Sequence, residues 1–410
     1  MNQPIRVALI HDWLTGMRGG EYVLEAIAEI FPRSDLFTLI YVPGRIAPAI
    51  TALKRHTSWL QKIPKIESRY RYFLPLMPKA IESFDLTGFD LIISSSHCVA
   101  KGIRKPKDAF HVSYVFAPMR YMWDRFDEYF GPPKSSAPVR ALAHRLRPFL
   151  QNWDRQASST KNVDELMSIS RYIATQVKNA YGRDSEIIYP FVNLDRFQLP
   201  RQAGRNYLLV SAFAPYKRVE LAIEAFNRLK LPLLVVGSGQ DEKRLKKLAG
   251  PTIEILGSLS NSAISDLYRK CKAFIFPGEE DFGITPLEAM ASGAPVIAYG
   301  SGGVLETVTE KTGIFFRPQT VEALMEAVLK IENGEIKLSE ADCRARAREF
   351  SKEKFQTEFI TQIKKAWLKS GRDLKPLEEK IEAGWAFKGD HDTHRINLGT
   401  QPKENPHGRN

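Results

Sequence analysis

The sequence predicts an α/β protein with two doubly wound, Rossmann-like domains. Two series of short apolar runs alternate with helical patterns, one before residue 199 and one after residue 205. Such alternation with short connections is typical of parallel sheets covered by helices. The length of 410 residues also exceeds what one typical core needs. We therefore expect two domains, each built on its own parallel sheet.

The first series opens with an apolar run at residues 5–10, which predicts a buried strand. A loop with Gly16, Gly19 and Gly20 follows, and a helical pattern runs from about residue 21 to residue 30. The glycines do not have the G-x-G-x-x-G spacing of dinucleotide-binding loops, so the sequence disfavours NAD. They still predict a flexible backbone loop at the sheet edge where ligands of α/β folds bind.

Later apolar runs of the first series predict strands at residues 35–41, 91–93, 110–116, 166–169 and 187–193. His97 follows the strand at 91–93, so we expect it at the carboxyl end of that strand. A helix is expected from residue 172 to about residue 181.

The second series predicts strands at residues 207–210, 231–236, 253–256, 273–276 and 296–298. Helices are expected at residues 216–229, 240–249, 262–271 and 351–369. The expected division is a first domain at 1–198, a second domain at 199–350, a helix at 351–370 that returns to the first domain, and a polar, partly disordered tail at 371–410.

Composition restricts the class of protein. A formal net charge of +12 directs attention to acidic partners, such as nucleic acid, anionic lipid or phosphorylated small molecules. No nucleic-acid-binding motif is present, so nucleic acid is not expected. The cysteines Cys98, Cys271 and Cys343 lack metal-ligand spacing, which fits a reducing cytoplasm and no metal site. The absence of a long apolar run and of a signal-peptide pattern also predicts a cytoplasmic protein.

Two basic segments interleave cations with apolar side chains. Residues 51–80 carry a single acidic residue, Glu67, among cations and aromatic residues. Residues 134–155 place arginines beside a stripe of leucines and a phenylalanine. This pattern fits a helix lying on an anionic membrane, and it equally fits an amphipathic helix packed on a core. The sequence leaves both interpretations open, so a peripheral position on the inner face of the membrane is one of two expectations.

Residues 276–307 read FPGEEDFGITPLEAMASGAPVIAYGSGGVLET. Thr285, followed by Pro286 and then by Glu288, predicts a helix start with a hydroxyl N-cap. A helix start just past a strand end offers backbone N–H groups to an anion. The carboxylates of Glu280 and Glu288 flank this start, which predicts a site for a phosphate that carries hydroxyl-rich groups. By itself, Glu288 fits the role of a capping-box residue equally well.

Four further stretches accompany this acidic pair: HDWLTGMRGGE, SSSHCVAKG, APMRYMWD and APYKRVELAIEAF. In this order, on two α/β domains, they resemble the GT-B glycosyltransferases, and most closely the retaining glycosyltransferase family 4 (group 1), where mannosyltransferases of bacterial surface polysaccharides are prominent. The resemblance covers residues 5–365. It implies a GT-B fold, with a cleft between the two domains and a C-terminal helix that crosses back.

The resemblance also implies an activity. A hexose, with mannose from GDP-mannose as the leading choice, would be transferred with retention of configuration to a saccharide or polyprenyl-linked acceptor. The setting would be the assembly of a polysaccharide or O-antigen-type glycan. Cations and oriented N–H groups stabilise the charge that develops on the leaving diphosphate, so no metal or other cofactor is expected.

By resemblance, three residues would be catalytic. His97 would lie beneath the transferred sugar, Glu280 would accept hydrogen bonds from its hydroxyls, and Lys217 would neutralise the leaving diphosphate. The residues implied in donor binding are Gly19, Gly20, Arg218, Leu256, Gly257, Phe282, Gly283, Ile284, Thr285 and Glu288.

Among the donor-binding residues, Glu288 would hold the ribose hydroxyls. Ile284 and Thr285 would present backbone N–H groups to the diphosphate, and the backbone around Leu256 and Gly257 would meet the nucleobase. The glycines of the first domain would let its loop approach the donor phosphate or the acceptor.

One departure concerns the leaving group. The family often has an arginine five or six residues before the lysine, where this chain has Ala212. Ala212 cannot bind phosphate, and Arg218 is the candidate that would compensate, although arginine and lysine place their donors differently. Arg120 and Trp123 fit interdomain packing as well as a site. The alternatives are a non-catalytic nucleotide-sugar-binding or scaffold protein and another GT-B enzyme that uses a UDP-sugar.

Overall fold

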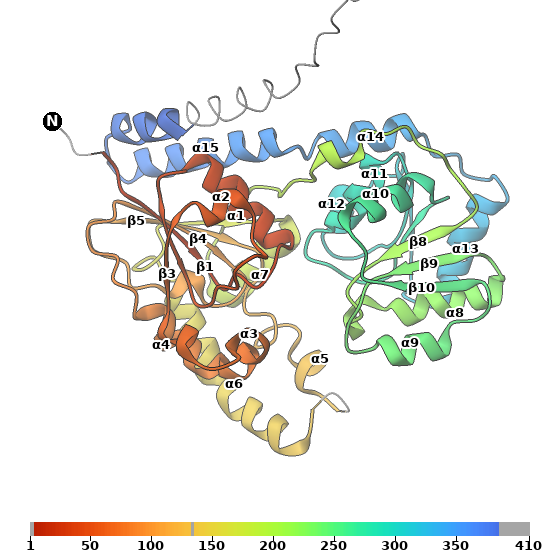
Figure 1. The fold of residues 1–410 in the computed structure, drawn as a ribbon, viewed down its shortest axis with the longest axis horizontal. Coiled ribbons are helices and arrows are strands. Elements are labelled where there is room, and N and C mark those ends of the chain that lie inside the picture. Colours follow the sequence, from red (N-terminus) through yellow and green to blue (C-terminus); the bar gives the residue numbers. More distant parts are fainter. Residues whose placement is uncertain (1–3, 133–134, 385–410) are drawn as a thin grey trace, which may run out of the picture.

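The computed structural model describes residues 4–132 and 135–384. Two all-parallel sheets form the centres of two α/β domains, which lie side by side in Figure 1. The first sheet has the order β3-β2-β1-β4-β5-β6-β7 and the second the order β10-β9-β8-β11-β12-β13. In both sheets the strand order reverses beside the first strand, so each domain is doubly wound, as predicted.

The strands of the first domain are β1 (Val7–His11), β2 (Asp35–Thr38), β3 (Lys54–Thr57), β4 (Leu91–Ser96), β5 (Phe110–Val115), β6 (Glu165–Ser168) and β7 (Glu186–Ile187). Its α-helices are α1 (Gly19–Ile30), α2 (Pro48–Thr51), α3 (Ile66–Arg69), α4 (Met77–Glu82), α5 (Phe126–Phe130), α6 (Ala137–Ala157) and α7 (Arg171–Tyr181). Short 3-10 helices are η1 (Trp59–Lys62), η2 (Tyr70–Leu76), η3 (Ala100–Gly102) and η4 (Leu194–Phe197).

The strands of the second domain are β8 (Tyr207–Val210), β9 (Leu233–Val236), β10 (Ile253–Gly257), β11 (Phe274–Phe276), β12 (Val296–Tyr299) and β13 (Gly313–Phe316). Its helices are η5 (Pro215–Lys217), α8 (Val219–Leu229), α9 (Glu242–Leu248), α10 (Asn261–Lys270), α11 (Ile284–Ala291), α12 (Val304–Thr307), α13 (Val321–Glu332) and α14 (Glu340–Arg348). The long helix α15 (Lys352–Lys369) follows.

Two strand predictions of the first domain need correction, and in the second domain β13 was not predicted. β3 lies in the basic segment 51–80, where no strand was predicted, because its residues KRHT are polar and mostly exposed at the edge of the sheet. The run at 187–193 forms only the two-residue strand β7, and the chain then leaves the sheet as a linker. In that linker, the backbone N–H of Val192 bonds to the carbonyl of Phe350 (3.0 Å). The apolar residues of the run therefore bury against the end of the second domain rather than in the sheet.

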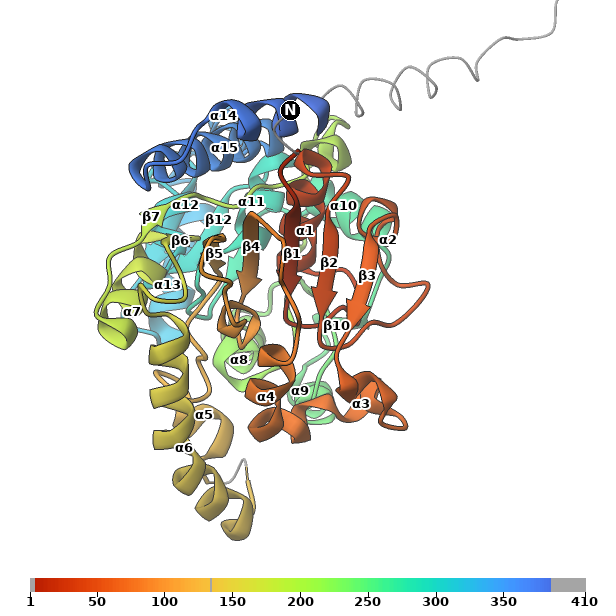
Figure 2. The ribbon, with the colours of Figure 1, turned by 90° about the vertical axis from the view of Figure 1, so that its left-hand side faces the viewer.

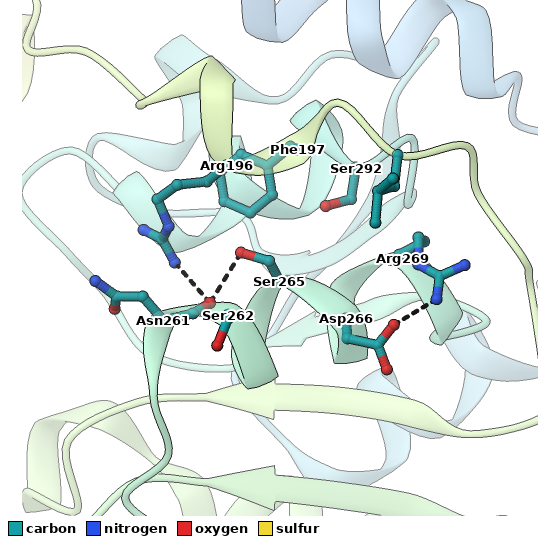
Figure 3. Close-up of a pocket in the computed structure, with 9 residues that line it drawn as sticks. Arg196, Phe197, Asn261, Ser262, Ser265, Asp266, Arg269 and Ser292 are labelled. Carbon is teal, nitrogen blue, oxygen red and sulfur yellow. Dashed lines mark hydrogen bonds and ion pairs between the residues drawn. The ribbon is translucent and has the colours of Figure 1, made fainter. Parts of the chain in front are cut away.

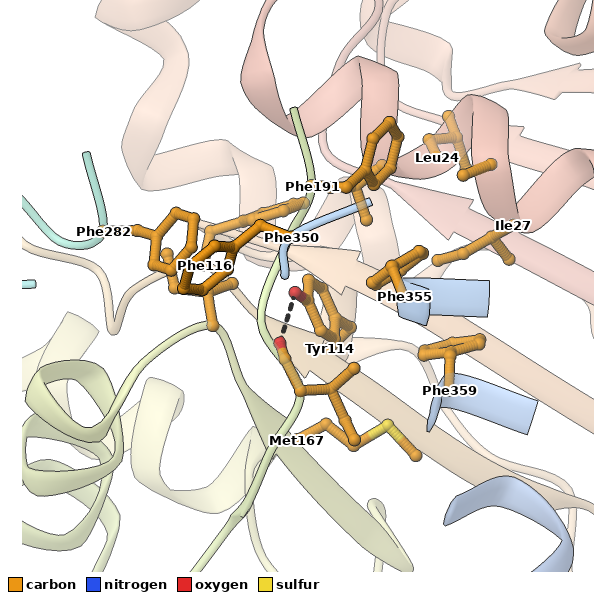
Figure 4. Close-up of a cluster of buried hydrophobic side chains, with 14 of the residues drawn as sticks. Leu24, Ile27, Tyr114, Phe116, Met167, Phe191, Phe282, Phe350, Phe355 and Phe359 are labelled. Carbon is orange, nitrogen blue, oxygen red and sulfur yellow. Dashed lines mark hydrogen bonds between the residues drawn. The ribbon is translucent and has the colours of Figure 1, made fainter. Parts of the chain in front are cut away.

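A continuous apolar core joins the two domains. Phe282 of the second domain packs near Tyr189 and Phe350, with ring centroids 5.8 and 5.7 Å away. Figure 4 shows this aromatic group continuing through Phe116 and Tyr114 toward helix α1. Because the same core holds parts of both domains, it fixes the loops of one domain against those of the other.

Helix α15 runs along the first domain after the chain has completed the second (Figure 1). The side chain of Gln356 donates a hydrogen bond to the carbonyl of Ala26 in α1 (2.9 Å), and Lys352 pairs with Glu29. Residues 375–384, which the sequence assigned to a polar tail, are helical and bury Leu377 and Ile381. The remainder of the expected tail, 385–410, lies outside the described residues.

Candidate active site

The predicted site residues flank the points where the strand order of each sheet reverses. In the first domain these are the carboxyl ends of β1 and β4, which lead into Asp12 and His97. In the second they are the ends of β8 and β11, which lead to Lys217 and Glu280. Ligands of doubly wound sheets bind in the crevices at such points.

Asp12 holds the turn that carries His97. Its fully buried carboxylate accepts the backbone N–H groups of residues 97, 98, 99 and 100 at 2.6–3.1 Å. It also lies 3.1 Å from Nδ1 of the His97 ring. Burial opposes ionisation, but the neighbouring histidines and the N–H groups outweigh it and lower the pKa of Asp12. No role was predicted for Asp12, although it lies in the stretch HDW after the first strand.

His97 is partly open to solvent. Its ring is 32% exposed and meets the Trp13 ring edge-on, with centroids 4.6 Å apart. Desolvation lowers the pKa of His97, with Arg120 and Lys101 adding to the shift and Asp12 opposing it. The imidazole is therefore neutral near pH 7 and is held through Nδ1, which leaves Nε2 as the nitrogen for a ligand.

A buried ion pair stabilises the turn after His97. Lys101 and Asp154 of α6 are both fully buried and form an ion pair at 2.7 Å. The side chains of Trp123 and Tyr181 donate hydrogen bonds to the same carboxylate (2.8 and 2.9 Å). Trp123 thus helps to hold this turn within the first domain, and it also packs against the apolar core that joins the domains. A buried pair with these extra donors fixes the turn rigidly.

The glycine loop meets the second domain. Helix α1 begins at Gly19, two residues earlier than predicted, and a Cβ at Gly19 would lie 3.0 Å from Cδ1 of Ile284. A Cβ at Gly20 would lie 3.3 Å from the Phe116 ring. The start of α1 therefore faces the start of α11 across the domain boundary, which brings Gly19, Gly20 and Ile284 together.

Three consecutive carboxylates follow β11, and each is paired with a cation. Glu279 accepts from Arg125 (3.4 Å), Glu280 pairs with Lys217, and Asp281 pairs with Arg120. Arg120 and Arg125 belong to the first domain, so this acidic loop connects the domains. The ion pair between Arg120 and Asp281 confirms the prediction that Arg120 contributes to packing between the domains.

Glycines allow the loops of the second domain to approach one another closely. A Cβ at Gly278 would lie 2.9 Å from the backbone of Lys217, and one at Gly302 would lie 2.4 Å from the carbonyl of Glu280. The backbone N–H of Gly303 donates to that carbonyl (2.8 Å). The loop GSGG therefore supports the acidic loop through backbone contacts that side chains would prevent.

Lys217 and Arg218 point in different directions. Lys217 is 15% exposed, and burial, together with Arg120 and Arg125, lowers its pKa to about 7. Arg218 has a left-handed backbone (φ 52°) and pairs with Glu220 of α8 at 3.0 Å. The structure therefore brings Lys217 to Glu280 and turns Arg218 toward the helix surface.

Helix α11 starts earlier than predicted. Gly283, with φ 94°, is its N-cap, and the helix begins at Ile284. Thr285 is therefore not an N-cap, and Glu288 is not a capping-box residue. The sequence pattern misled because a left-handed glycine cap leaves no hydroxyl signature. Phe282 has a buried side chain, so only its backbone is available to a ligand.

Glu288 has partners from two other elements. It accepts hydrogen bonds from Arg196 in η4 (2.6 Å) and from the hydroxyl of Tyr268 in α10 (3.1 Å). Burial raises the pKa of Glu288, although Arg196 and Tyr268 oppose the shift. Arg196 was not predicted; it lies in the linker, where no sequence pattern marks it. The carboxylate is held in place and retains lone pairs for a further donor.

Leu256 and Gly257 end strand β10. Gly257 has φ 71°, and its carbonyl accepts the backbone N–H of Gly237 (2.9 Å). Leu256 is half-buried against the core that joins the domains. Two strands, β9 and β8, separate this turn from β11 in the sheet, and it lies at the same carboxyl edge as the acidic loop.

A cavity of about 300 Å³ lies between η4 and α10. Figure 3 shows Arg196, Asn261 and Ser265 at its wall, with Nη2 of Arg196 directed at the carbonyl of Asn261 (3.5 Å). None of the residues predicted to bind a donor lines this cavity. It adjoins the predicted site through Arg196, which also holds Glu288, and through Ser292, whose backbone N–H donates to the Glu288 carbonyl (3.2 Å).

Comparison with known proteins agrees with this geometry. Residues 192–350, which include the acidic loop and α11, match the family described as glycosyl transferases group 1. The chain is 30% identical over 212 residues to the GDP-mannose-dependent alpha-mannosyltransferase of Mycolicibacterium smegmatis (51% of this chain, 49% of that protein). It is 29% identical over 243 residues to human alpha-1,3/1,6-mannosyltransferase (50% of this chain, 58% of that protein).

These alignments are partial, since the chain spans about half the length of the curated relatives it matches. Among solved structures, a sucrose-phosphate synthase of Thermosynechococcus elongatus is similar to this chain with a TM-score of 0.67 at 18% identity (89% of this chain, 99% of that chain). At 18% identity, this structural similarity establishes the fold of the chain and not its activity. The chain therefore has a GT-B fold, and its residues 192–350 match the family model of the glycosyl transferases group 1.

Proposed function

We propose that this protein is a glycosyltransferase that moves a hexose from a nucleotide sugar to a saccharide or lipid-linked saccharide. The proposal rests on one observation: loops of the first domain and loops of the second lie opposite each other at the domain boundary. His97, held by Asp12, comes from one side, and Glu280 with Lys217 comes from the other. The opposed starts of α1 and α11 add backbone N–H groups to the same region.

For the donor, we propose GDP-mannose. Support comes from the relatives named as mannosyltransferases, one of them as GDP-mannose-dependent, and from the carboxylate of Glu288 beside the start of α11. A UDP-hexose is the alternative donor. We propose a polysaccharide or O-antigen-type glycan as the product and retention of configuration as the stereochemical course, both from the resemblance of the motifs.

In the proposed reaction, the diphosphate leaves between Lys217 and the N-terminus of α11. A cation and oriented N–H groups stabilise the negative charge that develops there, and no metal is part of the proposal. Lys217 then turns from Glu280 to the diphosphate, which frees Glu280 to accept hydrogen bonds from the hexose hydroxyls. The neutral imidazole of His97 contacts the sugar from the first domain.

We also propose that the first domain rests on an anionic membrane, where a lipid-linked acceptor would be found. Helices α3, α4, α5 and α6 gather at the end of this domain that lies away from α15 (Figures 1 and 2). Exposed apolar side chains on this end are Trp59, Tyr72, Leu76, Tyr129, Val139, Leu142 and Phe149. Exposed cations in the same segments are Lys62, Lys65, Arg69, Arg71, Lys79 and Arg145.

This end of the domain, called the basic end below, combines the two features that bind amphipathic helices to anionic lipid. Within the described part of the chain, no helix has the length and apolarity that crossing a membrane requires. Peripheral contact is the form of association that we propose.

A donor screen tests the proposed function. Purified protein is heated with GDP-mannose, UDP-glucose and UDP-N-acetylglucosamine in separate samples, and the melting temperature is recorded. A ligand that binds the folded state alone raises it, by an amount that grows with concentration. We expect the largest shift with GDP-mannose, followed by slow hydrolysis of that donor. Absence of a shift with every nucleotide sugar would refute the proposal, and binding without hydrolysis or transfer would favour the scaffold alternative.

A further inference from the structure

The second domain supplies few cations to the place where a diphosphate would leave. Ala212, which by the family resemblance stands where an arginine is often found, carries no charge, and the side chain of Arg218 is directed at Glu220, with 42% of it exposed. Lys217 remains, and it is paired with Glu280. A nucleoside diphosphate carries two or more negative charges, so a single lysine leaves it undercompensated.

The first domain places two arginines against the same loop. Arg125 is 6% exposed and has several partners: the Glu279 carbonyl (3.2 Å), the Glu279 carboxylate (3.4 Å) and Glu128 (3.3 Å). Its guanidinium also lies 5.2 Å from the centroid of the Tyr216 ring. Arg125 is therefore committed to holding the domains together.

Arg120 has a different environment. It reaches across the boundary from the loop after β5 and, among the described residues, pairs with Asp281 through Nη2. Asp281 is the neighbour of Glu280 in the chain, so the Arg120 and Lys217 ion pairs lie on adjacent residues. Arg120 also contributes to lowering the pKa of both His97 and Lys217, which agrees with a position between them.

We propose that Arg120 binds the diphosphate of the donor nucleotide by exchanging its partner Asp281 for phosphate oxygens. In doing so it supplies, from the first domain, the cation that Ala212 cannot supply in the second. A guanidinium suits this exchange because its planar fork binds phosphate oxygens through two parallel N–H donors. The inference rests on the proposed function, since it assumes a nucleotide-sugar donor.

The proposed exchange of partners predicts an effect of replacing Asp281 that simple interdomain packing does not predict. As a competitor for Arg120, Asp281 opposes diphosphate binding, so Asp281→Asn is expected to strengthen that binding. If Arg120 and Asp281 only held the domains in place, replacing either of them would have the same unfavourable effect.

The experiment measures the affinities of GDP, GMP and guanosine, and of UDP, UMP and uridine, by calorimetry. The proteins are wild type, Arg120→Ala, Arg120→Lys, Asp281→Asn and the surface control Arg104→Ala, whose side chain is 77% exposed. For the base that wild type binds, we expect Arg120→Ala to weaken the diphosphate roughly 10- to 100-fold, a loss typical of one charge-assisted contact. The nucleoside affinity is expected to stay constant, Arg120→Lys to recover part of the loss, and Asp281→Asn to bind the diphosphate more tightly.

Three other outcomes would contradict the role of Arg120, the partner exchange or the proposed function. An unchanged ratio of diphosphate to nucleoside affinity in Arg120→Ala would overturn the role of Arg120 while leaving the donor site standing. Equal weakening by Arg120→Ala and Asp281→Asn would assign the pair to interdomain packing. Failure of wild type to bind either diphosphate would overturn both this inference and the proposed function. Melting temperatures of all variants show whether the fold is retained.

Discussion

The carboxylate of Asp12 lies 3.1 Å from Nδ1 of His97 and also accepts the backbone N–H groups of residues 97–100. One buried side chain therefore fixes both the path of the turn and the orientation of the imidazole. Because an orphaned buried N–H is costly, this arrangement links the stability of the first domain to the geometry of its proposed catalytic residue.

Replacement of Asp12 is expected to affect stability and activity together. Asp12→Asn keeps the size of the side chain but replaces one accepting oxygen with a donor that faces backbone N–H groups. We expect the free energy of unfolding to fall by roughly 3–6 kcal/mol, the cost of two lost charge-assisted bonds. Urea unfolding measures this loss. His97→Gln is the matched variant and should reduce donor turnover with a much smaller loss of stability; the opposite order would contradict the assigned roles.

Glu288 is expected to recognise ribose hydroxyls. Wild type should bind GDP more tightly than 2′-deoxy-GDP, by about tenfold for one hydrogen bond to a charged group. In Glu288→Gln that preference should shrink, because the carboxylate that accepts from the hydroxyl is gone. Tyr268→Phe removes the hydroxyl that donates to Glu288. It serves as the control for a change in how the Glu288 carboxylate is held. A preference that survives intact in Glu288→Gln would show that the ribose lies elsewhere.

Lys217 makes diphosphate binding sensitive to pH. Its pKa is lowered to about 7, so in the free protein it loses its proton as the pH rises above that value. Since the diphosphate favours the charged amine, GDP affinity should fall between pH 7 and pH 8.5, by up to about tenfold per pH unit. Glu280, Arg120 and Arg125 face the amine. Lys217→Arg stays protonated and should give a flatter profile, which also controls for ionisation of the nucleotide; equal slopes would contradict the prediction.

The basic end is expected to bind anionic vesicles. Leu142→Glu and Phe149→Glu place carboxylates at positions that are 57% and 58% exposed, so the fold should tolerate them. Co-sedimentation with vesicles containing phosphatidylglycerol should decrease in both variants and should decrease with added salt for wild type. Leu329→Glu, at an exposed position on α13, is the control. Equal sedimentation of all four proteins would assign α6 to ordinary packing.

Much of the fold follows from the sequence because its strands are short and apolar. β1, β4, β5, β8 and β12 were all predicted, since each is buried in the middle of a parallel sheet. β3 was missed because an edge strand with one covered face can be polar. The start of α11 was misplaced because Gly283 caps the helix through its backbone conformation, which no residue pattern displays.

The site could be predicted in outline but not in its contacts. His97, Lys217 and Glu280 follow strands, so their common edge was foreseeable. The pairing of Arg120 with Asp281 joins residues 161 positions apart in different domains. Asp12 meets the 97–100 turn from 85 or more positions away. Such contacts depend on how the two sheets and their loops are placed in space, and a single sequence contains no local signal for them.

The most direct test of the account compares turnover of GDP-mannose by wild type, Glu280→Ala and Glu326→Ala. Glu326 is an exposed carboxylate on α13 and is the matched control. With radiolabelled donor, both hydrolysis and transfer to a lipid-linked acceptor extract are measured beside the melting temperature. We predict that Glu280→Ala loses at least about 100-fold in rate, as expected for a group that acts on the transition state, while Glu326→Ala matches wild type. Equal turnover by Glu280→Ala and Glu326→Ala would contradict the central claim that the acidic loop is the catalytic half of a sugar-donor site.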